Sequence, residues 1–120
     1  MRSFLIDELD ESLIAQLGAI LDERELASGI KNLYWLPLDE DMLTPLQKEH
    51  AAECGPHCMA LELLPNGVRL ELLVRARGKV QCECVGYTSA EAEQVMIQRL
   101  SSLVDEIHRT QVEGLFEMLA

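Results

Sequence analysis

Apolar and polar positions alternate most regularly in residues 59–64 and again in residues 68–75. This period of two is typical of strands that bury one face. The intervening Asn-Gly at 66–67 is a strong signal for a two-residue hairpin turn. Such a turn places Leu63 opposite Leu70, so that the apolar faces of the two strands match.

A third strand is predicted after a second turn at residues 77–79. Because side chains alternate across a sheet, a three-residue loop that pairs Val74 with Cys82 keeps the apolar positions on one face. Residues 58–87 are therefore expected to form a three-stranded antiparallel meander. Its buried face is expected to carry Met59, Leu61, Leu63, Leu70, Leu72, Val74, Val80, Cys82 and Cys84.

The segments before this meander predict two helices and a short strand. Residues 3–27 carry leucines and isoleucines at helical spacing, and Gly18 inside them would let another element approach closely. Residues 33–38 predict a short strand, which Pro37 confines to an edge or an end of the sheet. Residues 40–54 predict a second helix.

Residues 89–118 predict a long C-terminal helix, which Thr88 and Glu91 would begin as a capping box. A helix of about 30 residues is about 45 Å long, whereas a domain of this size is about 35 Å across. Either the helix breaks at residues 108–111, or its end projects and is covered by a second subunit. In the second case the interface residues are Val112, Leu115, Phe116 and Leu119.

Together these elements predict one α+β domain over residues 1–120, in the order α-β-α-β-β-β-α. An antiparallel sheet with one apolar face buries that face under helices, so the helices are expected on one side of the meander.

The charge of the chain narrows the classes of partner. Its 21 acidic residues against 10 basic ones give a net charge of −11. That charge disfavours nucleic acids and anionic membranes, and it permits a basic protein partner. No apolar run has the length of a signal peptide or a membrane span. We therefore expect a cytoplasmic protein whose four cysteines are reduced.

The strongest candidate for chemistry is a group of four metal-ligand residues within a short segment: His50, Cys54, His57 and Cys58. His50 and Cys54 share a face if the helix extends that far, and zinc takes four nitrogen or sulfur ligands. The alternative is that the cysteines are small buried side chains and the histidines lie in a polar loop. A redox pair is disfavoured, because three residues rather than two separate the cysteines. Apart from zinc, the sequence indicates no cofactor.

Cys82 and Cys84 are predicted to be core residues. In a strand, residues i and i+2 lie about 6.6 Å apart along the chain. Zinc-bound sulfurs lie near 3.8 Å from one another, given bonds of about 2.3 Å. A strand at this position would therefore hold the two thiols too far apart for one ion.

Arg75, Arg77 and Lys79 form the main basic cluster of the sequence. Charges at such a turn usually keep it solvated. The alternative is that they hold a phosphate or the carboxylate of a partner.

No motif of a nucleophile elbow, a P-loop or a dinucleotide fold is present in the sequence. The leading interpretation is a small acidic interaction or adaptor module, chaperone-like or regulatory, and homodimeric. In size and charge the chain is similar to small acidic dimeric α+β proteins such as secretion chaperones, a similarity that assigns no residue a role. The alternatives are a metal-binding or metal-sensing domain, and a small-molecule-binding domain or enzyme with its cleft between helices and sheet.

Overall fold

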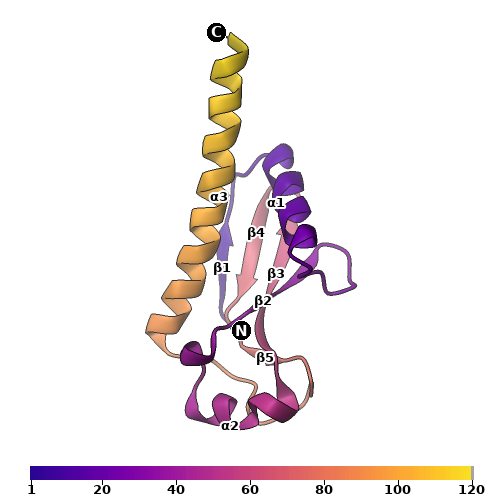
Figure 1. Cartoon of the computed structure of the whole chain (residues 1–120), viewed down its shortest axis with the longest axis vertical. Helices are drawn as coiled ribbons and strands as arrows, with labels where there is room; N and C mark the ends of the chain where they lie inside the picture. Colours follow the sequence, from indigo (N-terminus) through magenta and orange to yellow (C-terminus); the bar gives the residue numbers. More distant parts are fainter. Residues whose placement is uncertain (120) are drawn as a thin grey trace.

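Five strands form one antiparallel sheet in the order β1-β4-β3-β2, with β5 added beside β3 (Figure 1). The computed structural model describes residues 1–119. The strands are β1 (Ser3–Ile6), β2 (Leu33–Pro37), β3 (His57–Leu64), β4 (Gly67–Glu71) and β5 (Arg75–Ala76). The helices are α1 (Glu11–Glu23), the short 3₁₀ turn η1 (Glu40–Met42), α2 (Pro45–Cys54) and α3 (Ala90–Leu119).

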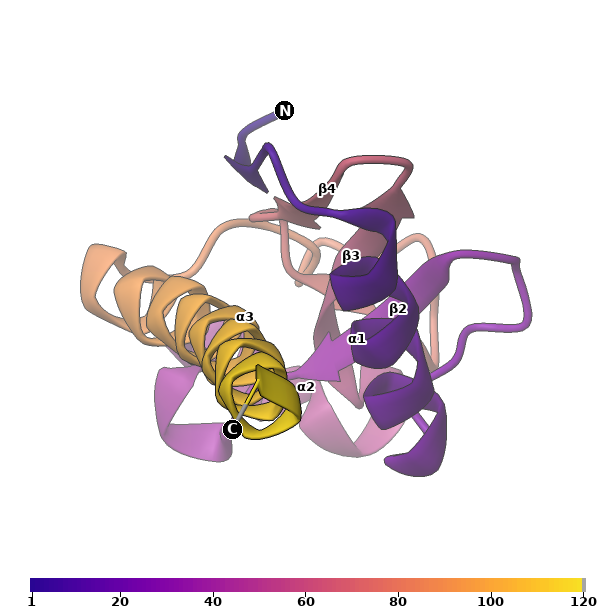
Figure 2. The same cartoon turned by 90° about the horizontal axis from the view of Figure 1, so that it is seen from above.

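Helices α1 and α3 cover the same face of the sheet (Figure 2). The leucines of α1 and the apolar stripe of α3 pack with one face of β3 and β4 in a single core. Its most buried members include Leu13, Leu17, Leu21, Met59, Leu61, Val68, Leu70, Met96 and Leu100. The α+β class, the antiparallel sheet and the long C-terminal helix are thus confirmed.

The prediction of one helix over residues 3–27 is correct only for its middle part, where α1 spans Glu11–Glu23. The first residues form β1, which pairs with β4. Asp10 then caps α1 by accepting a hydrogen bond from the amide of Leu13 at 2.7 Å. Glu8 has a positive φ of 58°, which a continuous helix does not allow. Before this break, β1 pairs with β4, and its Phe4 and Ile6 pack against the core.

The first hairpin has the predicted faces but a different register. Leu70 lies opposite Leu61 rather than Leu63, a shift of two residues that leaves every side chain on its expected face. The shift sets Glu62 opposite Arg69, and the two form an ion pair at 2.9 Å.

Gly67 is the first residue of β4 rather than part of the turn. A Cβ at this position would lie 2.6 Å from the carbonyl oxygen of Ile6, so glycine allows the end of β1 to approach. The Asn-Gly pattern therefore marks a close contact between strands as well as the end of a hairpin.

The third strand of the meander was predicted wrongly. β5 is two residues long and pairs with β3, with His57 opposite Ala76. Val74 forms an isolated bridge with Gly86 instead of pairing with Cys82. Val80, expected on the buried face, is 77% exposed. The chain here forms a loop because its backbone finds hydrogen-bond partners on α2, as described for the candidate site.

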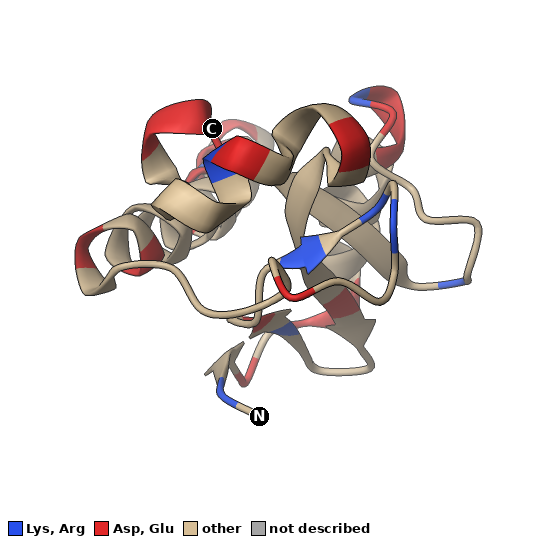
Figure 3. Ribbon diagram, turned by 90° about the horizontal axis from the view of Figure 1, so that it is seen from below, with Lys and Arg blue, Asp and Glu red and all other residues tan. Residues whose placement is uncertain are grey.

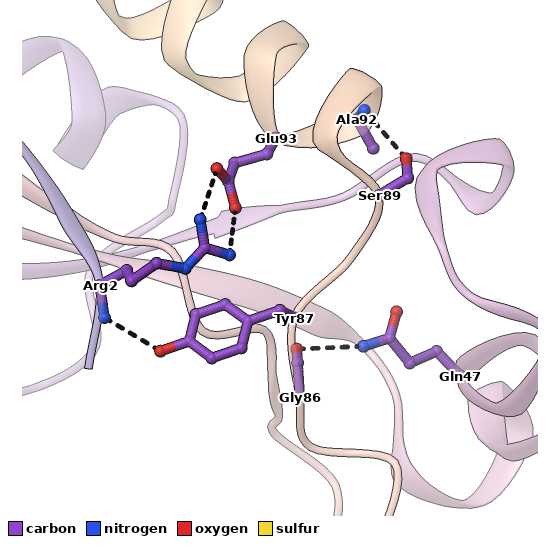
Figure 4. A network of polar contacts seen from close by, with 7 residues as sticks. All are labelled: Arg2, Gln47, Gly86, Tyr87, Ser89, Ala92 and Glu93. Carbon is purple, nitrogen blue, oxygen red and sulfur yellow. Dashed lines mark hydrogen bonds and ion pairs between the residues drawn. The ribbon is translucent and has the colours of Figure 1, made fainter.

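The predicted helix over residues 40–54 is divided into η1 and α2. Thr44 caps α2 together with Gln47 in a capping box. The start of α3 is capped by Ser89, whose hydroxyl accepts from the amide of Ala92 at 3.1 Å (Figure 4). The cap predicted at Thr88 is thus one residue early, and the Thr88 hydroxyl instead donates to the carbonyl of Met42.

A polar clamp joins the N-terminal segment to the start of α3 (Figure 4). The guanidinium of Arg2 donates two hydrogen bonds to the carboxylate of Glu93, at 3.1 and 2.9 Å. The backbone amide of Arg2 donates to the hydroxyl of Tyr87 at 3.0 Å, and its guanidinium lies 4.4 Å from the centre of that ring.

Helix α3 does not break at residues 108–111, and its end projects from the body (Figure 1). The molecule measures 56 × 29 × 23 Å along its principal axes. In the described part of α3, Ile107 is the last buried residue. None of the helices within residues 1–119 is long and apolar enough to cross a membrane.

Candidate metal centre

The last turns of α2 present His50 and Cys54 on the same face of the helix. They are four residues apart, and the Sγ of Cys54 lies 3.8 Å from the Nδ1 of His50. Cys54 is fully buried, whereas His50 is half-buried at the surface. This is the spacing at which two side chains of a helix can bind one ion.

The loop before α3 brings Cys82 and Cys84 to the same place. The amide of Val85 donates to the carbonyl of Cys82 at 3.1 Å, which closes a tight turn. In this turn the two thiols are not held apart as they would be in a strand. The prediction that Cys82 and Cys84 are too far apart to bind one ion assumed that they lie on a strand. The structure has no strand between β5 and α3.

The four donor atoms of His50, Cys54, Cys82 and Cys84 all lie within 4.8 Å of one another. The Sγ of Cys82 lies 3.2 Å from the Nδ1 of His50 and 3.6 Å from the Sγ of Cys54. A tetrahedral zinc ion with sulfurs at about 2.3 Å and nitrogen at about 2.0 Å sets its ligands about 3.5 to 3.8 Å apart. The cluster therefore has close to the spacing that one such ion requires.

Of the four residues singled out in the sequence, the structure brings two into this cluster and leaves two beside it. His57 is the first residue of β3, and its Nε2 lies 3.4 Å from the Sγ of Cys84. Cys58 follows in the same strand and is buried, with its side chain on the opposite face because adjacent residues of a strand alternate.

Two further side chains contact the ligands from outside. The carboxylate of Glu83 lies 3.8 Å from the Nε2 of His50, which leaves Nδ1 free to face the thiols. His57 is 3% exposed, and within residues 1–119 its Nδ1 has no hydrogen-bond partner. Carboxylates and buried donors of this kind commonly orient metal ligands.

The environments of the three thiols differ. The backbone amide of Cys84 donates to Cys82 and, with the neighbouring thiols and His50, lowers the pKa of Cys82 to about 7. Burial, followed by the hydrogen bond from Cys82, raises the pKa of Cys84 to about 12. Burial and then the neighbouring Cys82 also raise the pKa of Cys54. One thiolate, at Cys82, is thus available near neutral pH.

Burial also lowers the pKa of His57, and the nearby His50 lowers it further. The ring of His57 is therefore neutral near pH 7, with one nitrogen that donates and one that accepts. Nε2 is the nitrogen that faces Cys84.

The backbone around the cluster is held by several hydrogen bonds. The buried amide of Gln47 donates to the carbonyls of Cys84 at 3.3 Å and of Gly86 at 3.4 Å, the latter drawn in Figure 4. The amide of Arg77 donates to the carbonyl of Pro56 at 3.1 Å. Helix α2 and the loop are therefore positioned against each other by the polypeptide itself.

The sequence did contain a signal for the second pair of ligands. Cys82 and Cys84 form a Cys-x-Cys unit between two glycines, Gly78 and Gly86, in a segment with few large apolar residues. Apolar alternation predicts a strand here, whereas the two glycines favour a loop.

The residues predicted to form an interface lie on the projecting end of α3. Their exposed fractions rise from 38% for Val112 to 76% for Leu119, with Phe116 at 68%.

No family model, curated protein or solved structure matches the chain.

Proposed function

We propose that this chain is a zinc-binding domain with one structural Cys₃His site. The ligands are His50, Cys54, Cys82 and Cys84. The observation that carries the proposal is the convergence of these four donor atoms within 4.8 Å, from two segments far apart in the sequence.

The donor set supports zinc over other abundant divalent ions. Calcium and magnesium prefer oxygen ligands, whereas thiolates and imidazole suit zinc. Four protein ligands fill a tetrahedral coordination sphere and leave no position for water or substrate, which is the pattern of a structural site. The proposed role is therefore to hold the fold rather than to perform catalysis.

A zinc ion here would join α2 to the loop that leads into α3. The loop passes from Cys84 through Gly86 and Tyr87 to the cap of α3, so the ion would fix the position from which the long helix starts. Binding energy for a structural zinc ion adds directly to folding energy. We propose that the stabilised domain acts as an interaction module.

The test is the zinc content of protein purified without chelators, measured by elemental analysis. We expect about one zinc per chain in the native protein, as one four-ligand site requires. Substitution Cys82→Ser should remove most of the zinc, because it replaces a ligand at the half-exposed side of the cluster. The matched control is Cys58→Ser, which changes a buried thiol outside the cluster and should keep the metal.

Native protein without zinc, or equal loss of zinc in both variants, would overturn the proposal. Stoichiometric copper or iron in place of zinc would preserve the ligand set but contradict the choice of metal.

A further inference from the structure

The projecting end of α3 is an apolar surface with no cover from its own body. We call residues 112–119 the tip. Its large apolar side chains are Val112, Leu115, Phe116, Met118 and Leu119, all exposed. Such a surface usually marks an interaction site.

A groove lies on the face of the sheet that the helices leave open. Trp35 of β2 is opposite Ala60 of β3, and Ala60 faces away from the core residues Met59 and Leu61. This groove has a volume of about 450 Å³. Its apolar lining comes from Ile30, Leu33, Trp35, Ala60, Ala76 and Val80.

The groove exposes large side chains of the kind that anchor interfaces. Ile30 is 66% exposed at its rim, and Val80 is also largely exposed. The guanidinium of Arg77 lies 5.7 Å from the centre of the Trp35 ring. Tryptophan and arginine are enriched among the residues that dominate binding energy.

The charges of the two surfaces are opposite. The groove is lined by two basic residues, Arg75 and Arg77, and by one acidic residue, Glu71. Glu71 forms an ion pair with Arg75. Blue basic segments lie side by side around the short strand in Figure 3, although the chain as a whole has a net charge of −11. The tip carries no basic residue and two acidic ones, Glu117 and Glu113, of which Glu113 forms an ion pair with Arg109 at 2.9 Å.

We propose that the tip of one copy docks in the groove of a second copy, and that the second copy does the same in return. The tip and β5 lie toward opposite ends of the long axis (Figure 1). Docking of each tip in the other copy's groove would relate the two copies by a two-fold axis. No zinc ligand lines the groove, and Val80 lies two residues before the proposed ligand Cys82 in the same loop.

The experiment uses the full chain and measures mass in solution by light scattering and native mass spectrometry. The tip variant is Phe116→Glu and the groove variant is Val80→Glu. Both positions are exposed, so both variants should fold, which circular dichroism checks. The matched control is Val95→Glu, an exposed apolar residue of α3 outside both surfaces.

We expect the native chain and the control to be dimers. Each variant alone should dissociate, with a dimer constant weakened by about tenfold or more, as loss of a central apolar anchor implies. Mixing the two variants should produce mixed dimers, because the intact tip of one fits the intact groove of the other.

Three results would overturn the proposal. A native chain that is monomeric in solution would contradict the proposed dimer. A dimer that Phe116→Glu breaks and Val80→Glu leaves intact indicates that two tips pair with each other. Two monomeric variants that form no mixed dimer show that tip and groove do not meet.

Discussion

The backbone amide of Gly78 donates a hydrogen bond to the carbonyl of Cys54 at 2.8 Å. This contact sets the loop after β5 directly on the end of α2, beside two of the four proposed ligands. The approach is closer than any other residue type would allow. A Cβ on Gly78 would lie 2.7 Å from the carbonyl oxygen of Gly55 and 2.9 Å from that of Cys54.

Substitution Gly78→Ala should therefore weaken zinc binding without changing a ligand. The added methyl group meets backbone atoms, so the loop must move away from α2, at about 1 to 3 kcal/mol of stability. Chelator competition measures the affinity, and urea denaturation measures the stability.

The matched control for this variant is Gly86→Ala in the same loop. Among the described residues no atom lies within 4 Å of a Cβ built there. Equal losses of affinity in both variants would contradict the close contact at Gly78 as the cause.

Much of the fold could be predicted because it follows from local patterns. The alternation in β3 and β4 and the helical period in α1 and α3 depend only on which side of each element is buried. The register of the hairpin could not be read in this way. The observed register sets Arg69 opposite Glu62, and the end of β1 lies close to Gly67.

Half of the candidate site could be predicted and half could not. His50 and Cys54 belong to one helix, so their spacing alone brought them together. Cys82 and Cys84 reach them only because the segment forms a loop on α2, and that depends on long-range hydrogen bonds from Gln47. Alternation in sequence cannot distinguish such a loop from a strand.

Removal of the metal should destabilise the domain. A ligand present at about 1,000 times its dissociation constant stabilises the folded state by about 4 kcal/mol. Addition of a strong chelator should therefore lower the melting temperature of the native protein by roughly 10 °C or more. Scanning calorimetry with and without chelator makes the measurement.

Cys54→Ser is the companion to that experiment. Without this ligand the melting temperature should be lower than that of the native protein even before chelator is added. Addition of the chelator should then leave it unchanged. A variant that responds like the native protein would show that the chelator acts elsewhere.

His57 should tune the site as a positioning residue. Its Nε2 faces the Sγ of Cys84, and removal of such a supporting hydrogen bond costs about 10- to 100-fold in metal affinity. We expect His57→Leu to bind one zinc with an affinity lowered by that range. His57→Gln keeps an N–H donor and should recover part of the loss.

The spectrum of the cobalt-substituted protein separates this role from a purely structural one. Loss of the hydrogen bond should shift the thiolate-to-cobalt charge-transfer band of His57→Leu. An unchanged band together with unchanged affinity would show that His57 only fills space.

The clamp between Arg2 and Glu93 should stabilise the start of α3. The carboxylate of Glu93 is largely buried while Arg2 is more than half exposed, so solvent weakens the pair. We expect Arg2→Ala to lower the free energy of unfolding by roughly 1 kcal/mol, because it leaves the carboxylate with fewer partners. Urea denaturation measures this change.

Arg69→Ala gives the comparison, because the pair that it removes is exposed on both sides. Its effect should stay within about 0.5 kcal/mol. A larger loss from Arg69→Ala than from Arg2→Ala would contradict burial of Glu93 as the reason for the difference.

X-ray absorption at the zinc edge tests the central claim most directly, because it reports the atoms bound to the ion. The site of His50, Cys54, Cys82 and Cys84 predicts about three sulfur neighbours at about 2.3 Å and about one nitrogen at about 2.0 Å. Equal numbers of sulfur and nitrogen neighbours would instead match His50, Cys54, His57 and Cys58. That result, or a shell of oxygen and nitrogen alone, would contradict the ligand set proposed for this structure.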